Sequence, residues 1–102
     1  MPRYAFKVVT EDLRSLGLRN NPTILEYEVG VWVRSPQAIR GRVDSGGVWA
    51  ARTLCGARGL ARYMLREHGV QTRVFRSEIG DVIRENTYRV QTDRIRLLEE
   101  II

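Results

Sequence analysis

The chain of 102 residues has room for one domain with one hydrophobic core, because chains divide into separate cores only well beyond about 200 residues. Hydrophobic residues make up 43% of the sequence and charged residues 28%, a balance that supports a packed interior and excludes a disordered chain. The formal net charge is +5, and Lys7 is the one lysine among 17 basic residues. The other basic residues are arginines, which favour a polyanion as partner; a bias toward arginine codons, with the side chains spread over a solvated surface, is the alternative.

The single cysteine, Cys55, excludes a disulfide bond within the chain and a cysteine-based zinc site, which needs at least two thiolates. No run of residues approaches the ~18 apolar residues that span a bilayer, and the first residues lack the apolar segment of a signal peptide. We therefore expect a cytoplasmic protein with no membrane partner, no metal ion and no resident cofactor.

The first half of the chain shows two extended patterns. Alternation of apolar and polar residues predicts a strand over residues 4–9. Residues 10–22 are rich in turn formers and indicate a loop with room for one helical turn over residues 11–16. Residues 23–34 give the clearest strand pattern, in which Gly30 marks a bulge or a close backbone approach. Its expected buried face consists of Leu25, Tyr27, Val29, Val31 and Val33.

The second half contains the one well-defined helix. A basic loop over residues 35–47 leads into a short strand at 48–52, and Thr53 is then a typical N-cap for a helix over residues 54–68 that ends at Gly69.

Extended patterns return over residues 70–80 and 88–92, with a turn suggested by Gly80 and Asp81. As a helix, the last segment would place arginines at its N-terminus and glutamates at its C-terminus, against the helix dipole, so we predict a strand over residues 95–98. The fold class expected is a single α+β domain with a largely antiparallel sheet of about five strands and the helix packed on one face, the other face being partly open.

The predicted helix has an apolar side and a basic side. At about 100° per residue, the apolar arc consists of Leu54, Ala57, Leu60, Ala61, Met64 and Leu65. Arg58, Arg62 and Arg66 form a stripe on the opposite side, next to Tyr63, the aromatic residue that could interleave with them. Such a stripe indicates either a solvated face or a polyanion site. His68 falls on the apolar side, where we expect a hydrogen-bonded packing residue.

The start of the helix has free backbone N–H groups, which can bind an anion between Arg52 and Arg58. Gly56 and Gly59 each cost about 1 kcal/mol relative to alanine within a helix, so close approach of a ligand, or of a neighbouring strand or loop, would account for them. Cys55 is either a reactive thiol or a small structural residue of the first turn.

Two resemblances can be stated. The segment "GGVWAARTLCGARGLARYM" is similar to the NAD-binding half of ADP-ribosyltransferase-like domains, where glycines, a short strand and a Thr or Ser precede a helix with Ala and an aromatic residue. The N-terminal "FKVV", "EDL" and "YEVG" resemble small uncharacterised domains of phage and bacterial proteins.

The transferase resemblance implies NAD as substrate, a basic residue on the first strand (Lys7 or Arg3), a polar residue before the central strand (Ser45) and a catalytic glutamate (Glu78). The chain departs from that pattern, because it has no His at the first position, no Ser-x-Ser pair, and Arg76 two residues before the glutamate. A catalytically silent relative therefore stays open.

We expect a binding module for nucleic acid or an acidic protein, whose binding residues are Arg52, Arg58, Arg62, Arg66 and Tyr63. A transferase-like enzyme using NAD is the second hypothesis. The third is a homodimer or larger assembly, in which the apolar C-terminus "LLEEII" or an open sheet edge pairs with another copy.

Overall fold

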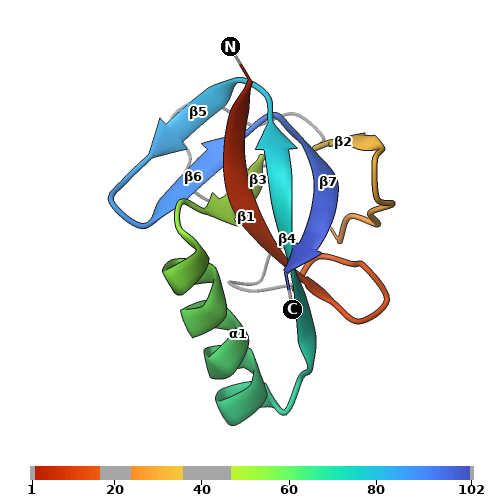
Figure 1. Ribbon diagram of the computed structural model, residues 1–102, viewed down its shortest axis with the longest axis vertical. Coiled ribbons are helices and arrows are strands. Elements are labelled where there is room, and N and C mark those ends of the chain that lie inside the picture. The colour runs from red at the N-terminus through yellow and green to blue at the C-terminus, as the bar shows by residue number, and fades with distance from the viewer. Residues whose placement is uncertain (1, 17–23, 36–46, 102) are drawn as a thin grey trace.

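The computed structural model describes residues 2–16, 24–35 and 47–101, which form one α+β domain (Figure 1). Its elements are β1 (Arg3–Thr10), β2 (Trp32–Arg34), β3 (Val48–Ala51), α1 (Leu54–His68), β4 (Thr72–Ile79), β5 (Val82–Glu85), β6 (Arg89–Thr92) and β7 (Arg94–Ile101). Within the described residues the sheet has seven strands in the order β2-β7-β4-β1-β3-β6-β5, and every neighbouring pair is antiparallel. The prediction of about five strands was too low, and β5, which is only four residues long, lies where no strand was predicted.

The helix has the predicted bounds, and both ends are held by the predicted residues. The Thr53 hydroxyl accepts a hydrogen bond from the N–H of Gly56 at 3.0 Å, which satisfies one of the free donors of the first turn. At the other end Gly69 adopts the left-handed conformation (φ 66°), and its N–H donates to the carbonyl of Leu65.

The strands on either side of α1 in sequence, β3 and β4, both pair with β1, so α1 crosses over β1 and contacts all three strands. Ala57 and Met64 are buried at this contact, as predicted. Leu65 is 48% exposed, against the prediction, because it lies at the margin of the apolar arc. His68 is also exposed, and its ring meets that of Tyr63 edge-on at 5.6 Å between centres.

The last four strands form one long hairpin with a bend in the middle. The register that pairs Ile79 with Ile95 continues past the bend, where Val82 pairs with Thr92. At the bend the Gly80 N–H donates to the carbonyl of Arg94, and the Asp93 N–H donates to the carbonyl of Asp81. A Cβ on Gly80 would lie 2.5 Å from side-chain atoms of both Asp93 and Arg94, so glycine is required at this corner.

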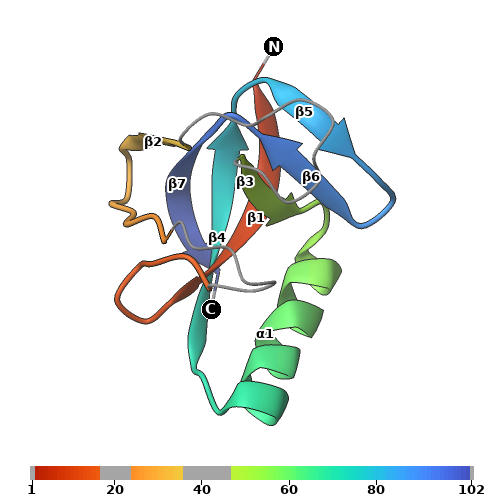
Figure 2. The same cartoon turned by 180° about the vertical axis from the view of Figure 1, so that it is seen from behind.

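The bend forces the sheet to curl. Three strands separate β6 from β7 in the sheet order, which in a flat sheet would place them about 19 Å apart at ~4.8 Å per strand. Only Asp93 joins these two strands, and two residue steps span about 7 Å. The sheet therefore rolls until β6 and β7 meet at the corner. Both views show β2 and the β5–β6 arm on opposite sides of this curled sheet (Figure 1; Figure 2).

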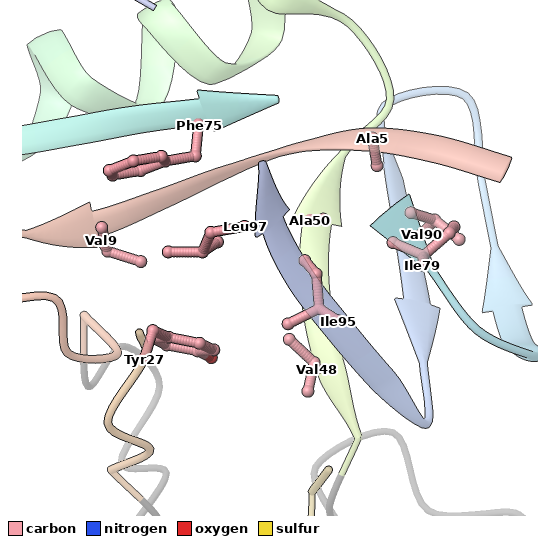
Figure 3. Close-up of a cluster of buried hydrophobic side chains, with 10 residues drawn as sticks. All are labelled: Ala5, Val9, Tyr27, Val48, Ala50, Phe75, Ile79, Val90, Ile95 and Leu97. Atoms are coloured by element: carbon pink, nitrogen blue, oxygen red, sulfur yellow. The ribbon is translucent and has the colours of Figure 1, made fainter. Parts of the chain in front are cut away.

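Both faces of the sheet bury apolar side chains, and the outer face is partly open, since Tyr4 and Trp32 are exposed on it. The inner face holds the larger core (Figure 3), formed by Ala5, Val9, Tyr27, Val48, Ala50, Phe75, Ile79, Val90, Ile95 and Leu97. The outer face, on which α1 packs, holds a smaller cluster formed by Val8, Ala51, Ala57 and Val74. Curling explains the difference, because a rolled sheet covers its own inner face.

The strand predicted over residues 23–34 is wrong for most of the part that the structure describes. Gly30 has a φ of +84° and sits in a turn, and the N–H of Val31 donates to the carbonyl of Glu28. Tyr27 is buried, but Val29 is 47% exposed. The chain therefore turns away from the core around Gly30 and returns to it at Val33, and only Trp32–Arg34 is a strand.

The helical turn predicted over residues 11–16 is also wrong. The carbonyl of Thr10 accepts from the N–H of Leu13, which has a positive φ of 61° that no α-helix continues. Arg14 then forms an isolated antiparallel bridge with Glu26. The predicted basic loop lies mostly in residues 36–46, outside the described residues.

Candidate functional site

The predicted arginines of α1 are exposed side by side on its outer side. We call Arg58, Arg62, Tyr63 and Arg66 the helix stripe; all four are exposed. Among the described residues, no carboxylate lies within ion-pairing distance of Arg58 or Arg62, and Arg66 binds only its neighbour Glu67, at 2.9 Å. The first turn of the helix has no acidic residue either. Three guanidinium groups thus face solvent with one adjacent carboxylate, which makes the helix stripe a basic surface.

Arg52 is not part of this surface. Its Nη1 donates to the carbonyl of Asn86 at 2.9 Å, and its Nε lies 3.8 Å from a carboxylate oxygen of Glu85. Its guanidinium therefore ties the end of β3 to the turn between β5 and β6.

The glycines of the helix start have no close neighbour of the kind expected from the sequence. Nothing described lies within 4 Å of a Cβ built on Gly59. The nearest atom to a Cβ on Gly56 is the hydroxyl of the N-cap Thr53, at 3.2 Å. Among the described residues, the expected approach of a strand or loop is therefore wrong at Gly59, and at Gly56 it amounts to the cap and the Cβ of Ala51 on β3, at 3.8 Å. Close approach of a ligand stays a prediction.

A second group of arginines lies on the outer face of the sheet, and no pattern in the sequence indicated it. Residues paired across neighbouring strands point to the same face. The register pairs Trp32 with Arg96, Arg96 with Glu78, and Glu78 with Tyr4, which makes one row across β2, β7, β4 and β1. Arg96 and Glu78 form an ion pair in the middle of the row, and the two aromatic rings stand at its ends.

The guanidinium groups in and beside this row stack on the aromatic rings. Those of Arg94 and Arg96 lie 5.1 and 5.0 Å from the centre of the Trp32 ring, and that of Arg76 lies 5.1 Å from the centre of the Tyr4 ring. Trp32 is 38% exposed and Tyr4 is 50% exposed. We call this surface the sheet patch; its members are Tyr4, Trp32, Arg34, Arg76, Arg94 and Arg96.

The charges of the sheet patch are largely compensated. Arg96 binds Glu78, and Arg76 lies 3.7 Å from Glu99. Arg34 and Arg94 share Asp93, at 3.2 and 3.0 Å. Among the described residues, four arginines thus face three carboxylates, which gives the sheet patch a small positive excess. Stacked planar groups are its distinguishing feature.

The residues that the transferase resemblance implies do not meet on one face. Lys7 lies between Ala5 and Val9 on the inner face, and its Nζ donates to the carbonyl of Trp49 at 2.7 Å. Glu78 lies on the outer face in its ion pair with Arg96. Arg3 forms an ion pair with Glu85, and Ser45 lies outside the described residues. The NAD hypothesis stays a prediction from the sequence.

One further ion pair shifts the pKa values of its partners. Arg73 on β4 donates from Nη2 to Glu100 on β7 at 2.7 Å and from Nε at 3.1 Å. This double hydrogen bond lowers the pKa of Glu100 and raises that of Arg73. It ties two neighbouring strands together and lies outside both basic surfaces.

Within residues 2–16, 24–35 and 47–101, no group of three or more His, Cys, Asp or Glu side chains is placed to hold a metal ion. No helix in the same part of the chain is long and apolar enough to cross a membrane. Cys55 is exposed and unpaired. No family model matches the sequence, and neither a curated protein nor a solved structure matches it.

Proposed function

We propose that this protein is a binding module for a nucleic acid, which it holds as a polyanion through the helix stripe. The observation that carries the proposal is the state of Arg58 and Arg62, which are exposed and have no carboxylate partner among the described residues. Guanidinium groups that are free of internal partners can exchange bound counterions and water for phosphates at little cost. An acidic protein would meet the same charges, but the exposed ring of Tyr63 beside the arginines favours a partner with bases to stack.

The test is fluorescence anisotropy with a labelled 20-nucleotide single strand over a series of salt concentrations. We expect affinity to fall as salt rises, because each phosphate contact releases condensed counterions. The double variant Arg58→Ala/Arg62→Ala removes two contacts and should reduce the slope of log affinity against log salt by about 1.4. Both residues are exposed, so the fold should be unaffected.

The matched control is Arg14→Ala/Arg84→Ala, which removes the same charge from positions outside both basic surfaces. It should bind nearly as tightly as the unaltered protein, with nearly the same slope. If the control variant weakens binding as much as the helix variant, net charge and not the helix stripe holds the partner. No binding at low salt, or equal competition by polyglutamate, would overturn the nucleic-acid proposal.

Self-association is a second candidate, favoured by the outer edge of β7. Here β2 pairs only with the first residues of β7, and the N–H of Gly30 donates to the carbonyl of Leu97. Beyond Leu97 no described strand covers that edge, which leaves backbone groups that a second copy can pair with. Sedimentation equilibrium should then show a dimer that Leu98→Lys weakens. A monomer at all concentrations contradicts this candidate.

A further inference from the structure

The sheet patch has a composition that ion pairing alone does not explain. Trp32 is on an outermost strand, exposed, and flanked by the guanidinium groups of Arg94 and Arg96. Buried aromatic rings stabilise a protein through the apolar area that they remove from water. The Trp32 ring lies on the outer face of the sheet, away from the main core on the inner face, so core packing does not account for it. Tyr4 repeats the arrangement three strands away, beneath Arg76.

The patch is held in place before any ligand binds. The register fixes Trp32 opposite Arg96, and Glu78 and Asp93 fix the guanidinium groups of Arg96 and Arg94 beside the ring. A ligand therefore meets planar groups whose side-chain freedom is already reduced, which lowers the entropic cost of binding. With one arginine in excess over the carboxylates, the patch suits a ligand that combines flat faces with a moderate negative charge.

We propose that the sheet patch binds the bases of single-stranded nucleic acid by stacking on Trp32, Tyr4 and the guanidinium planes beside them. Aromatic rings and arginine planes accept any unpaired base, because every base has a π face. Bases within a duplex are stacked on one another and cannot reach the patch. This inference rests on the proposed function, from which it takes nucleic acid as the partner. It adds a second binding surface with a different role. The helix stripe attracts phosphates, and the sheet patch distinguishes single strands from duplexes.

The length of a strand allows it to reach both surfaces. The longest extent of the molecule is 33 Å, and a 20-nucleotide strand spans about 68 Å when stacked at 3.4 Å per nucleotide. A strand of this length is therefore the probe of choice.

The experiment compares Trp32→Leu with Trp32→Phe, using the 20-nucleotide single strand, a duplex of the same length, and heparin, a polyanion without bases. Leucine keeps an apolar side chain on the strand but removes the stacking plane, and phenylalanine restores a plane. We expect Trp32→Leu to weaken binding to the single strand by about fivefold to 150-fold, with the salt slope unchanged. Heparin and duplex affinities should stay the same, and Trp32→Phe should recover most of the loss.

Circular dichroism shows whether Trp32→Leu disturbs the edge strand β2. Tyr4→Leu is a second variant on another strand, and it should also weaken single-strand binding selectively, by a smaller factor. An unchanged single-strand affinity in both leucine variants overturns the inference, as does an equal loss for heparin. If the unaltered protein binds the single strand and both leucine variants do too, the sheet patch fails and the helix stripe stands. If the unaltered protein binds none of the three probes, both proposals fall.

Discussion

The corner that rolls the sheet depends on the side chain of Asp93, and replacing it tests that dependence. Its Oδ1 accepts the N–H of Asp81 at 2.9 Å, and its Oδ2 binds Arg94 at 3.0 Å and Arg34 at 3.2 Å. A hydrogen bond to a charged group contributes ~1.5–3 kcal/mol, and an ion pair with an exposed arginine about 0–1 kcal/mol. Because the corner is only partly buried, with the Asp93 side chain 25% exposed, we expect Asp93→Ala to lower the free energy of unfolding by about 2 kcal/mol.

The assay is urea unfolding followed by circular dichroism, with Asp93→Asn as a partner variant. Asparagine keeps an oxygen that can accept the N–H of Asp81 but loses both ion pairs, so it should cost about 1 kcal/mol or less. Glu67→Ala removes an equal charge from the surface of α1 and should change stability by about 0–1 kcal/mol. If Asp93→Ala costs no more than Glu67→Ala, the backbone bonds hold the corner alone and the reasoning is refuted.

Two other changes test the helix contact and the hydrogen-bonded ion pair. Met64→Ala should lower the free energy of unfolding in urea by about 2–4 kcal/mol, because Met64 lies on the buried side of α1 and is only 4% exposed. Leu65→Ala, on the exposed side of the helix, should cost much less. Equal losses would contradict the packing of α1 on the sheet. Glu100→Gln should destabilise the protein at neutral pH, since the folded-state pKa of Glu100 lies below its ordinary value of 4.5. The stability that ionised Glu100 contributes is complete above pH 4.5 and is lost as pH falls through the lower folded-state pKa. The difference in unfolding free energy between the variant and the unaltered protein should therefore become smaller on acidification. A difference that stays constant or grows would contradict the pairing with Arg73.

The helix could be predicted because its signals are local. Thr53 lies next to the first turn that it caps, Gly69 ends the last turn, and the apolar arc repeats at the helical period. The alternation of residues 23–34 was misleading, because an alternating pattern does not show where the chain turns. The alternation continues in the sequence past Gly30, but the positive φ of Gly30 turns the chain at that residue.

The sheet patch could not be predicted, because it depends on strand register between distant parts of the chain. Trp32 and Arg96 are far apart in sequence, and the residues around each of them do not indicate that the two strands pair in this register. The charges of the last segment argued against a helix and so indicated a strand, but they did not indicate what lies beside it. The helix stripe needed only the helical period, and for that reason it was found from the sequence.

The most direct test of the account is a titration of the isotope-labelled protein with the 20-nucleotide single strand at low salt, followed by amide NMR shifts up to about millimolar strand, above the range of most non-specific dissociation constants. We expect the largest shifts on the outer side of α1 around Arg58 and Arg62 and on β2 and β7 around Trp32 and Arg96, with little change at Arg14 or on β5. Shifts that are confined to other surfaces, or the absence of shifts at the highest concentration, would contradict it.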